Sequence, residues 1–292
     1  MDIDQLKKEN DGYKTVKIDN IFFLINDGGD ELGYHYNQNI ISNPNVMKNM
    51  LIQRCIKYCN KYFFCIIPDK SVLLKNILES VFKKKCYRPT LEVIKDLDCV
   101  IDSYDSIIDI CSKNNSMCCH STDTHSTQLS LYAFYSSVVT KLNLVPIDII
   151  ISQVPYSRGD LTCEINNGTR DYENINKWNL PIFALKNNYE LDCFQIIDIF
   201  KENHLDSNNR LYNHEINRNN VNCLINQSID NNIKVLYFHD SNMNHLIKTC
   251  FSSHYKYNYF INGQFDENII SLINPDIIIE ETMERFLNTY RG

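Results

Sequence analysis

The sequence predicts an α/β fold in which a parallel sheet is flanked by helices. Near the C-terminus, short strand-like runs alternate with short helix-like runs, and such an alternation requires crossover connections between parallel strands. The run at 62–70, "YFFCIIPDK", is wholly apolar until Pro68 ends it, as expected of a strand buried on both faces. With 43% hydrophobic and 22% charged residues, the chain can bury a sizeable core.

The first half of the chain supplies an opening strand and three helices around that buried run. "VKIDNIFFLIND" at 16–27 reads as one strand closed by the turn signal Gly28-Gly29. A helix is predicted at 43–62, where apolar residues follow helical spacing and Pro44 stands at the start. A second helix follows through 71–84, and "QLSLYAFYSSVVTKL" at 128–142 is apolar almost all round, which predicts a buried helix.

The last sixty residues repeat the strand–helix alternation. Strands are predicted at 233–240, 255–263 and 274–281, and helices at 241–251, 266–273 and 282–290. Between the halves, residues 152–230 are rich in asparagine and have few periodic segments. We therefore expect a single domain over 1–292 that carries an insertion at 152–230.

Composition excludes several classes of function. The net charge of −7 argues against a general nucleic-acid binder. No run of 18 apolar residues exists, and the acidic N-terminus lacks the apolar segment of a secretory signal, so we expect no membrane partner. The twelve cysteines lack the short spacings of a disulfide-stapled scaffold. Buried free thiols are the simpler interpretation, and they predict a cytoplasmic protein.

Two short motifs place a nucleophile and its base at separate points of the chain. Ser241 directly follows the predicted strand at 233–240, at the edge of a parallel sheet where ligands gather. Its backbone N–H and the dipole of the following helix could stabilise an oxyanion. A serine needs a base to become nucleophilic. His125 can be that base, and Asp123, two residues earlier, can hold its tautomer and stabilise the imidazolium.

Each of these residues also has a simpler interpretation. Ser241 can be a helix N-cap, and Asp123 can cap the helix predicted at 128–142. His125 can be a polar residue at the edge of a loop. A zinc site is a further alternative, although the spacing lacks the usual paired ligands, and we expect no metal. Its candidate ligands are Cys118, Cys119, His120, Asp123 and His125.

The order of the motifs is shared with a known family. "TDTH" at 122–125, "HDSN" at 239–242 and "PDIIIEETMER" at 275–285 together resemble the alginate O-acetyltransferase-like branch of the SGNH hydrolase superfamily. "IIPDK" at 66–70 and "GDL" at 159–161 resemble weaker landmarks of that branch. The resemblance implies an SGNH-like (flavodoxin-like) sheet, circularly permuted because the Asp-x-His precedes the Asp-Ser. It also implies a catalytic triad of Ser241, His125 and Asp123.

The chain departs from the family beside the triad. Ser126 stands where the family has tryptophan, His239 where it has glycine, and Asn242 where it has phenylalanine. These changes replace an apolar wall by hydroxyl, imidazole and amide groups, so His239 and Asn242 are predicted to bind substrate. Arg158 is a third candidate, since its planar guanidinium suits a phosphate; the alternative is that it pairs with Asp160.

These observations predict an acetyl (acyl) transferase that modifies a sugar or glycan precursor through an acyl-serine intermediate, at a hydroxyl or an amine. For a cytoplasmic enzyme, acetyl-CoA is the expected donor, and the acceptor sugar can be nucleotide-linked. One alternative is a carbohydrate esterase or deacetylase with the same triad, in which water replaces the acceptor sugar. Another is a catalytically inactive domain that only binds glycan.

Overall fold

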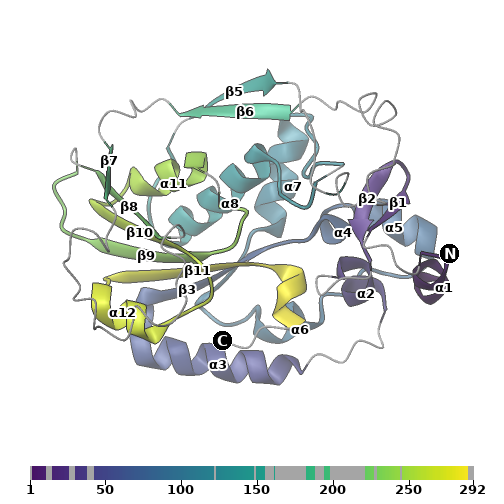
Figure 1. The fold of residues 1–292 in the computed structure, drawn as a ribbon, viewed down its shortest axis with the longest axis horizontal. Helices are drawn as coiled ribbons and strands as arrows, with labels where there is room; N and C mark the ends of the chain where they lie inside the picture. Colours follow the sequence, from purple (N-terminus) through teal and green to yellow (C-terminus); the bar gives the residue numbers. More distant parts are fainter. Residues whose placement is uncertain are drawn as a thin grey trace.

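The structure is a computed structural model. It describes residues 2–10, 15–25, 30–37, 43–121, 123–147, 149–154, 161, 182–187, 194–197, 221–226, 229–243 and 245–288. Figure 1 shows a central sheet with helices on both faces and a smaller group of elements, including both β1 and α1, at one end.

The central sheet confirms the predicted α/β class. Its seven described strands lie in the order β4-β3-β11-β9-β10-β8-β7. The first five are parallel to their neighbours, whereas β8 is antiparallel to β10 and β7 is antiparallel to β8. The strands are β3 (Tyr62–Ile67), β4 (Val100–Asp102), β7 (Phe194–Ile197), β8 (Val221–Asn226), β9 (Lys234–His239), β10 (Tyr257–Asn262) and β11 (Ile277–Met283).

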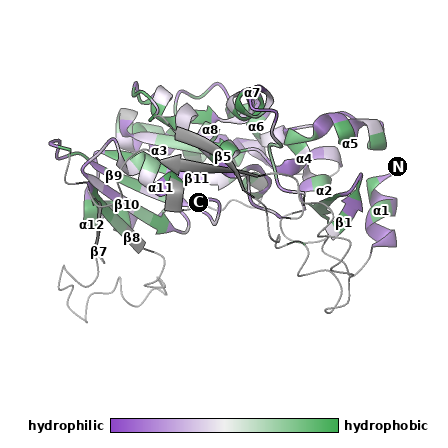
Figure 2. Cartoon of the chain, turned by 90° about the horizontal axis from the view of Figure 1, so that it is seen from above, coloured by the Kyte–Doolittle hydropathy of each residue, from purple (hydrophilic) through white to green (hydrophobic). Residues whose placement is uncertain are grey.

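Each face of the sheet packs against its own layer of helices because side chains alternate along a strand. On β9, Val235 and Tyr237 pack in one apolar cluster, and Leu236 and Phe238 pack in the other. Figure 2 shows apolar residues along the strands between the helices. One layer holds α8 (Gln128–Lys141) and α11 (His245–Ser252); the other holds α3 (Pro44–Tyr58), α6 (Pro89–Ile94) and α12 (Glu267–Ile273).

The smaller group of elements corrects the predicted opening strand. Instead of one strand over 16–27, β1 (Thr15–Ile18) and β2 (Ile21–Leu24) pair antiparallel. Asp19 and Asn20 join them with φ of 43° and 69°. Asp and Asn tolerate this left-handed conformation, which a tight hairpin turn requires. The group also contains α1 (Ile3–Glu9), α2 (Glu31–Tyr36), α4 (Lys70–Leu73) and α5 (Lys75–Phe82).

Other predicted elements are shifted at their ends. The helix predicted at 282–290 is absent as an α-helix, because β11 continues to Met283 and a 3-10 turn, Glu284–Asn288, follows. The predicted helix at 43–62 ends at Tyr58, where a 3-10 turn, Cys59–Lys61, leads into β3. Helix α7 (Tyr104–Lys113), which packs against α8, was not predicted.

The predicted insertion at 152–230 lies mostly outside the described residues, and its status as an insertion stays a prediction. Its described parts are strands. β5 (Ile149–Val154) pairs antiparallel with β6 (Ile182–Asn187), while β7 and β8 extend the central sheet. The candidate Arg158 lies outside the described residues.

One pair of cysteines departs from the expectation of buried free thiols. Cys55 on α3 and Cys99 just before β4 form a disulfide. The two cysteines are 44 residues apart, so their spacing in the sequence does not indicate the bond. The packing of α3 beside the start of β4 brings them together. The cysteine pattern therefore carries less weight as an argument for a reducing compartment. Within the described part of the chain, no helix is both long and apolar enough to cross a membrane.

Candidate functional site

Ser241 lies at the carboxyl end of β9, in the middle of the sheet. The strand is buried from Val235 to His239, and Ser241 is exposed directly beyond it. The helix expected to begin at Ser241 begins instead at His245, so Ser241 is not its N-cap. The helix dipole consequently starts about one turn farther along the chain than the sequence predicted. An exposed serine at the carboxyl edge of a parallel sheet is well placed for a ligand.

The structure brings Asp123, His125 and Ser241 into one line of hydrogen bonds. His125 Nδ1 lies 2.6 Å from Asp123 Oδ1, and His125 Nε2 lies 3.0 Å from Ser241 Oγ. Because a carboxylate only accepts hydrogen bonds, the shared proton of the first contact belongs to Nδ1. In the neutral ring, Nε2 is then free of a proton and accepts from the Ser241 hydroxyl. This is the geometry of a serine activated by a base.

The loop that carries Asp123 and His125 is anchored at both ends. Thr127 caps α8 by accepting from the backbone N–H of Ser130, so Asp123 is not the cap of that helix. Asp123 Oδ1 accepts from the backbone N–H of His125 at 2.9 Å, which folds the two residues together. Cys119 and Ser126 form an isolated antiparallel bridge across the loop. Local hydrogen bonds thus set the direction of the imidazole before any substrate arrives.

Asn242, which the sequence predicts to bind substrate, is buried and bonded within the protein. It is 3% exposed, and its Oδ1 accepts from the backbone N–H of Ser126 at 3.0 Å. Its own backbone N–H and Nδ2 donate to Asp240 Oδ1 at 2.7 and 3.1 Å. The side chain therefore joins the turn of Ser241 to the loop of His125. Only the folded chain shows this, since Ser126 and Asn242 are 116 residues apart.

His239 is buried, with 3% of its surface exposed. Its Nδ1 donates to the backbone carbonyl of Asp240 at 2.6 Å. Burial, together with the nearby charge of Lys248, lowers the pKa of His239 to about 4, so the ring is neutral near pH 7. The side chain lines a cavity of about 270 Å³ at the ends of β9, β10 and β11.

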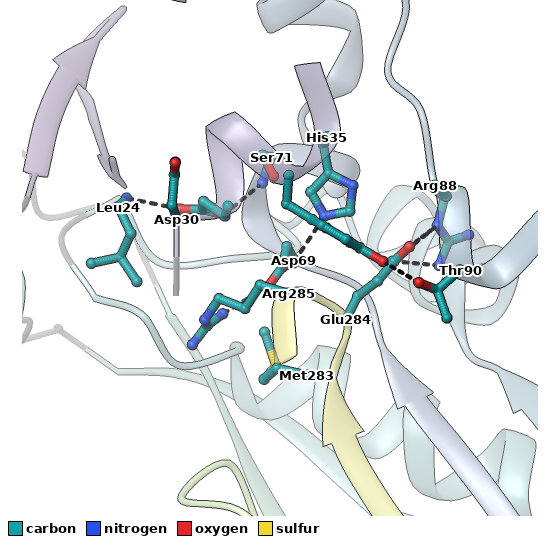
Figure 3. A network of polar contacts seen from close by, with 12 residues as sticks. Leu24, Asp30, His35, Asp69, Ser71, Arg88, Thr90, Met283, Glu284 and Arg285 are labelled. Atoms are coloured by element: carbon teal, nitrogen blue, oxygen red, sulfur yellow. Dashed lines mark hydrogen bonds and ion pairs between the residues drawn. The ribbon is translucent and has the colours of Figure 1, made fainter. Parts of the chain in front are cut away.

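A buried network of charged groups supports the site from the neighbouring strands (Figure 3). Asp69, just after β3, contacts His35 Nε2 at 2.9 Å and accepts from Arg285 at 2.7 Å. Burial disfavours charge on His35, but the hydrogen bond to Asp69 and the charge of Glu284 outweigh it and raise its pKa. For Asp69, burial acts to raise the pKa, but the charge of Arg285 and the hydrogen bond to His35 outweigh burial, and the pKa is lowered. Asp69 lies in "IIPDK", and Glu284 and Arg285 lie in "PDIIIEETMER". The sequence analysis noted both motifs but assigned no role to these three residues.

Glu281 of β11 links that network to the nucleophile. Its Oε2 accepts from the backbone N–H of Asp240, the residue before Ser241, at 3.0 Å. Burial and then the charge of Asp240 raise the pKa of Glu281 well above its usual range, and Arg285 opposes the shift. Arg88 donates to both Glu284 and Asp102, which ties the end of β11 to the end of β4, two strands away in the sheet. Polar contacts thus hold the ends of β3, β4, β9 and β11.

The alternative zinc ligands do not converge in the described part of the chain. There, no three His, Cys, Asp or Glu side chains are arranged to hold a metal ion. Asp123 and His125 bond instead to each other, and Ser130 donates to the backbone carbonyl of Cys118.

The fold was compared with those of known proteins. No family model matches the sequence, and a search of curated proteins finds no match either. Solved structures do match. A DHHW family protein from Eubacterium siraeum superposes with a TM-score of 0.61 at 11% identity, over 94% of each chain. PatB1 from Bacillus cereus has a TM-score of 0.59 at 13% identity, over 94% of this chain and 97% of its own. The O-acetyltransferase domain of Pseudomonas putida AlgJ has a TM-score of 0.52 at 14% identity, over 95% and 94%.

These likenesses confirm the predicted SGNH-like fold. They also correct the predicted donor. The AlgJ domain is an SGNH-type O-acetyltransferase, a class that takes acetyl from a donor other than acetyl-CoA, so the expectation of acetyl-CoA is wrong. The expected donor followed from an expected compartment and not from any group in the site.

Proposed function

We propose that this protein is an acyltransferase, most simply an acetyltransferase of the alginate O-acetyltransferase-like SGNH branch, that modifies a hydroxyl or an amine of a sugar. The observation that carries the proposal is the hydrogen-bonded line from Asp123 through His125 to Ser241, with contacts of 2.6 and 3.0 Å. The fold shared with the AlgJ O-acetyltransferase domain supports it.

In the first half of the reaction, Ser241 Oγ attacks the acyl carbonyl of the donor. The hydroxyl proton moves to His125 Nε2 as the new C–O bond forms, and Asp123 stabilises the resulting imidazolium through Nδ1–H. The tetrahedral intermediate then collapses, and the bond between the carbonyl carbon and the leaving group breaks. His125 returns the proton to the leaving group, which leaves an acyl-Ser241 ester.

In the second half, the acceptor takes the place of the departed group. His125 Nε2 accepts the proton of the sugar hydroxyl or amine while that group attacks the acyl carbonyl. The intermediate expels Ser241, which regains its proton from the imidazolium. The acylated sugar is released, and the hydrogen-bonded line from Asp123 to Ser241 is restored.

A carbohydrate esterase is the second candidate, because the same residues accept water as the acceptor. Ser241 is exposed in the described structure, and the His125 side chain is 38% exposed, so solvent reaches both groups. A transferase must favour the sugar over this water. The partition of the acyl group between sugar and water distinguishes the two activities.

The test uses p-nitrophenyl acetate, whose phenolate release reports attack on the acyl carbonyl. Wild-type protein is expected to release nitrophenolate and to carry one acetyl group on Ser241 in intact and peptide mass spectra. Ser241→Ala should reduce the release by several orders of magnitude, as in other serine triads, while the circular dichroism spectrum is unchanged. The control is Ser80→Ala, at an exposed position of α5. Acetylation that persists after Ser241→Ala would refute the covalent route.

Addition of glucosamine or glucose then separates transferase from esterase. A transferase yields acetylated sugar in proportion to the sugar supplied, and less free acetate. Acetate as the main product at every sugar concentration would favour the esterase. Binding of sugar with no acetyl-Ser241 under any condition would favour a domain that binds glycan without catalysis.

A further inference from the structure

Two carboxyl groups meet directly behind the nucleophile. Glu281 of β11 is 4% exposed, and its Oε2 accepts from the backbone N–H of Asp240, the residue before Ser241, at 3.0 Å. The side chains of Glu281 and Asp240 also hydrogen-bond each other. Glu281 Oε1 and Asp240 Oδ2 are buried, and no described donor reaches either atom. Buried polar atoms are normally bonded, so the contact between these carboxyl groups needs a physical account.

The preceding residue shows how a cation supports a buried glutamate on the same strand. Glu280 points to the opposite face of β11, where its Oε2 accepts from Arg54 at 2.7 Å. Glu281 has no such ion pair among the described residues. Arg285 is near enough to affect its pKa, but Arg285 Nη1 donates to Asp69 and its Nε has no described acceptor. A carboxylate buried without a bonded cation is costly, and a bound proton removes that cost.

The hydrogen bonds indicate which carboxyl group keeps the proton. Asp240 Oδ1 accepts from the backbone N–H and from Nδ2 of Asn242, at 2.7 and 3.1 Å, and such bonds stabilise the ionised form. Burial and then the charge of Asp240 raise the pKa of Glu281 well above its usual range. Two ionised carboxylates only accept hydrogen bonds, whereas a protonated Glu281 donates one to Asp240.

The other titratable groups that face Glu281 are consistent with this assignment. Cys65 lies opposite Glu281 on β3, and burial raises the pKa of its thiol well above the usual range, so the thiol is uncharged. His239, at the end of β9, is neutral near pH 7. Arg285, just beyond β11, lowers the pKa of Glu281, but burial and the neighbouring carboxylate have larger effects. Protonated Glu281 beside ionised Asp240 is therefore the favoured charge state.

This carboxyl pair is connected to both halves of the catalytic line. Asp240 precedes Ser241 and holds Asn242 through Oδ1, and Asn242 accepts from the backbone N–H of Ser126 at 3.0 Å. Ser126 directly follows His125 in the chain. A second negative charge on β11 would repel the Asp240 carboxylate and turn it away from Glu281. That movement would lengthen the contact between His125 Nε2 and Ser241 Oγ.

We propose that Glu281 is a positioning residue that stays protonated, donates a hydrogen bond to Asp240 and thereby holds Ser241 in line with His125. The role rests on the function proposed for Ser241, because Glu281 acts on the reaction only through the turn that carries this serine. No step of the acyl transfer takes the proton of Glu281, which stays between the two carboxyl groups throughout.

Infrared difference spectroscopy tests the proton directly. A protonated carboxyl group has a C=O stretching band that is separate from the bands of a carboxylate and that shifts in D₂O. The spectrum of wild type minus Glu281→Gln at pH 7 should contain this acid band. The matched control is Glu92→Gln on α6, an exposed carboxylate paired with Lys95, which should remove only carboxylate bands. Loss of carboxylate bands in place of the acid band in Glu281→Gln would overturn the proposal.

Hydrolysis of p-nitrophenyl acetate tests the positioning role. The amide of Glu281→Gln can replace both hydrogen bonds, because its oxygen accepts from the Asp240 N–H and its nitrogen donates to the Asp240 carboxylate. Most of the wild-type kcat should therefore remain in this variant. Glu281→Leu makes neither bond, and its kcat should fall by about 10- to 100-fold at little changed KM, since a misplacement of about 1 Å can cost about 10²-fold.

Two kinetic outcomes would contradict the positioning role. One is a loss of kcat in Glu281→Gln as large as that expected for Glu281→Leu, and this comparison with wild type stands even where the leucine variant does not fold. The other is a folded Glu281→Leu protein with wild-type kcat. Glu92→Gln should keep wild-type kcat and KM, because its side chain pairs with Lys95 on the surface of α6.

The two proposals fail separately. The infrared measurement needs no substrate, and acetylation of Ser241 by p-nitrophenyl acetate needs no sugar. Acetylation of Ser241 in wild type without the acid band of Glu281 refutes the role of Glu281 alone. The acid band without acetylation of Ser241 refutes the enzymatic function and leaves the protonated Glu281 as a structural support of the turn.

Discussion

Replacement of Asn242 by alanine tests how the two halves of the site are held in register. The Asn242 amide accepts from the Ser126 N–H at 3.0 Å and donates to Asp240 Oδ1 at 3.1 Å. Alanine leaves the Ser126 N–H without its partner in a residue that is only 7% exposed. An unsatisfied buried donor costs about 1–3 kcal/mol, so we expect the free energy of unfolding to fall by about 2 kcal/mol.

The same change should slow the reaction without weakening substrate binding. His125 is next to Ser126 in the chain. Loss of the amide bridge should therefore let the loop move and lengthen the contact between His125 Nε2 and Ser241 Oγ. A shift of about 1 Å at such a contact can cost about 10²-fold in rate, and kcat for p-nitrophenyl acetate should fall by about 10- to 100-fold with little change in KM.

The assay combines urea unfolding, followed by circular dichroism, with steady-state hydrolysis of p-nitrophenyl acetate. Asn76→Ala on the exposed face of α5 is the matched control and should change neither quantity. A rise in KM at unchanged kcat would show that Asn242 contacts substrate, as the sequence suggested. Wild-type kcat and wild-type stability together would refute the bridging role.

Three further predictions follow from the site and its supports. Asp123→Asn should lower kcat by roughly 10⁴-fold, since it removes the partner that fixes the tautomer of His125. The double variant Asp123→Asn/His125→Ala should lose much less kcat than the product of the two single losses. Multiplicative losses would contradict a shared mechanism. The pKa of His239 is about 4 when folded against an ordinary 6.5. The unfolded chain therefore gains a proton first as pH falls, and stability that is present above pH 6.5 is lost toward pH 4, by about 3 kcal/mol in total. His239→Phe should flatten the pH dependence of the urea midpoint over that range, and an unchanged slope would refute the assigned shift. Cys55→Ser should lower the free energy of unfolding by about 4 kcal/mol, because the bond to Cys99 closes a loop with a sequence separation of 44; a reducing agent should have the same effect on wild type and none on the variant.

Much of the architecture could be predicted because local hydrophobic patterns indicate its strands and helices. The alternation of short apolar runs and helical spacing in the last sixty residues indicated parallel strands with crossover helices, and β9, β10 and β11 form as expected. The order of the Asp-x-His and Asp-Ser motifs also placed Asp123, His125 and Ser241 as candidates for one site. Such inferences need only the type of each residue and its distance along the sequence.

What the sequence determined by itself was therefore the fold class and the residues that meet at Ser241. Tertiary structure alone decided the direction of the polar side chains around them. Asn242 and His239 have the same chemistry whether they face a ligand or the protein, and the choice depends on partners such as Ser126 and the cavity walls. The pairing of Asp69 with Arg285, 216 residues apart, depends on β3 and β11 being neighbours in the sheet. Hydrogen bonds are short and directional, so only the folded backbone selects which of the many possible partners each group finds.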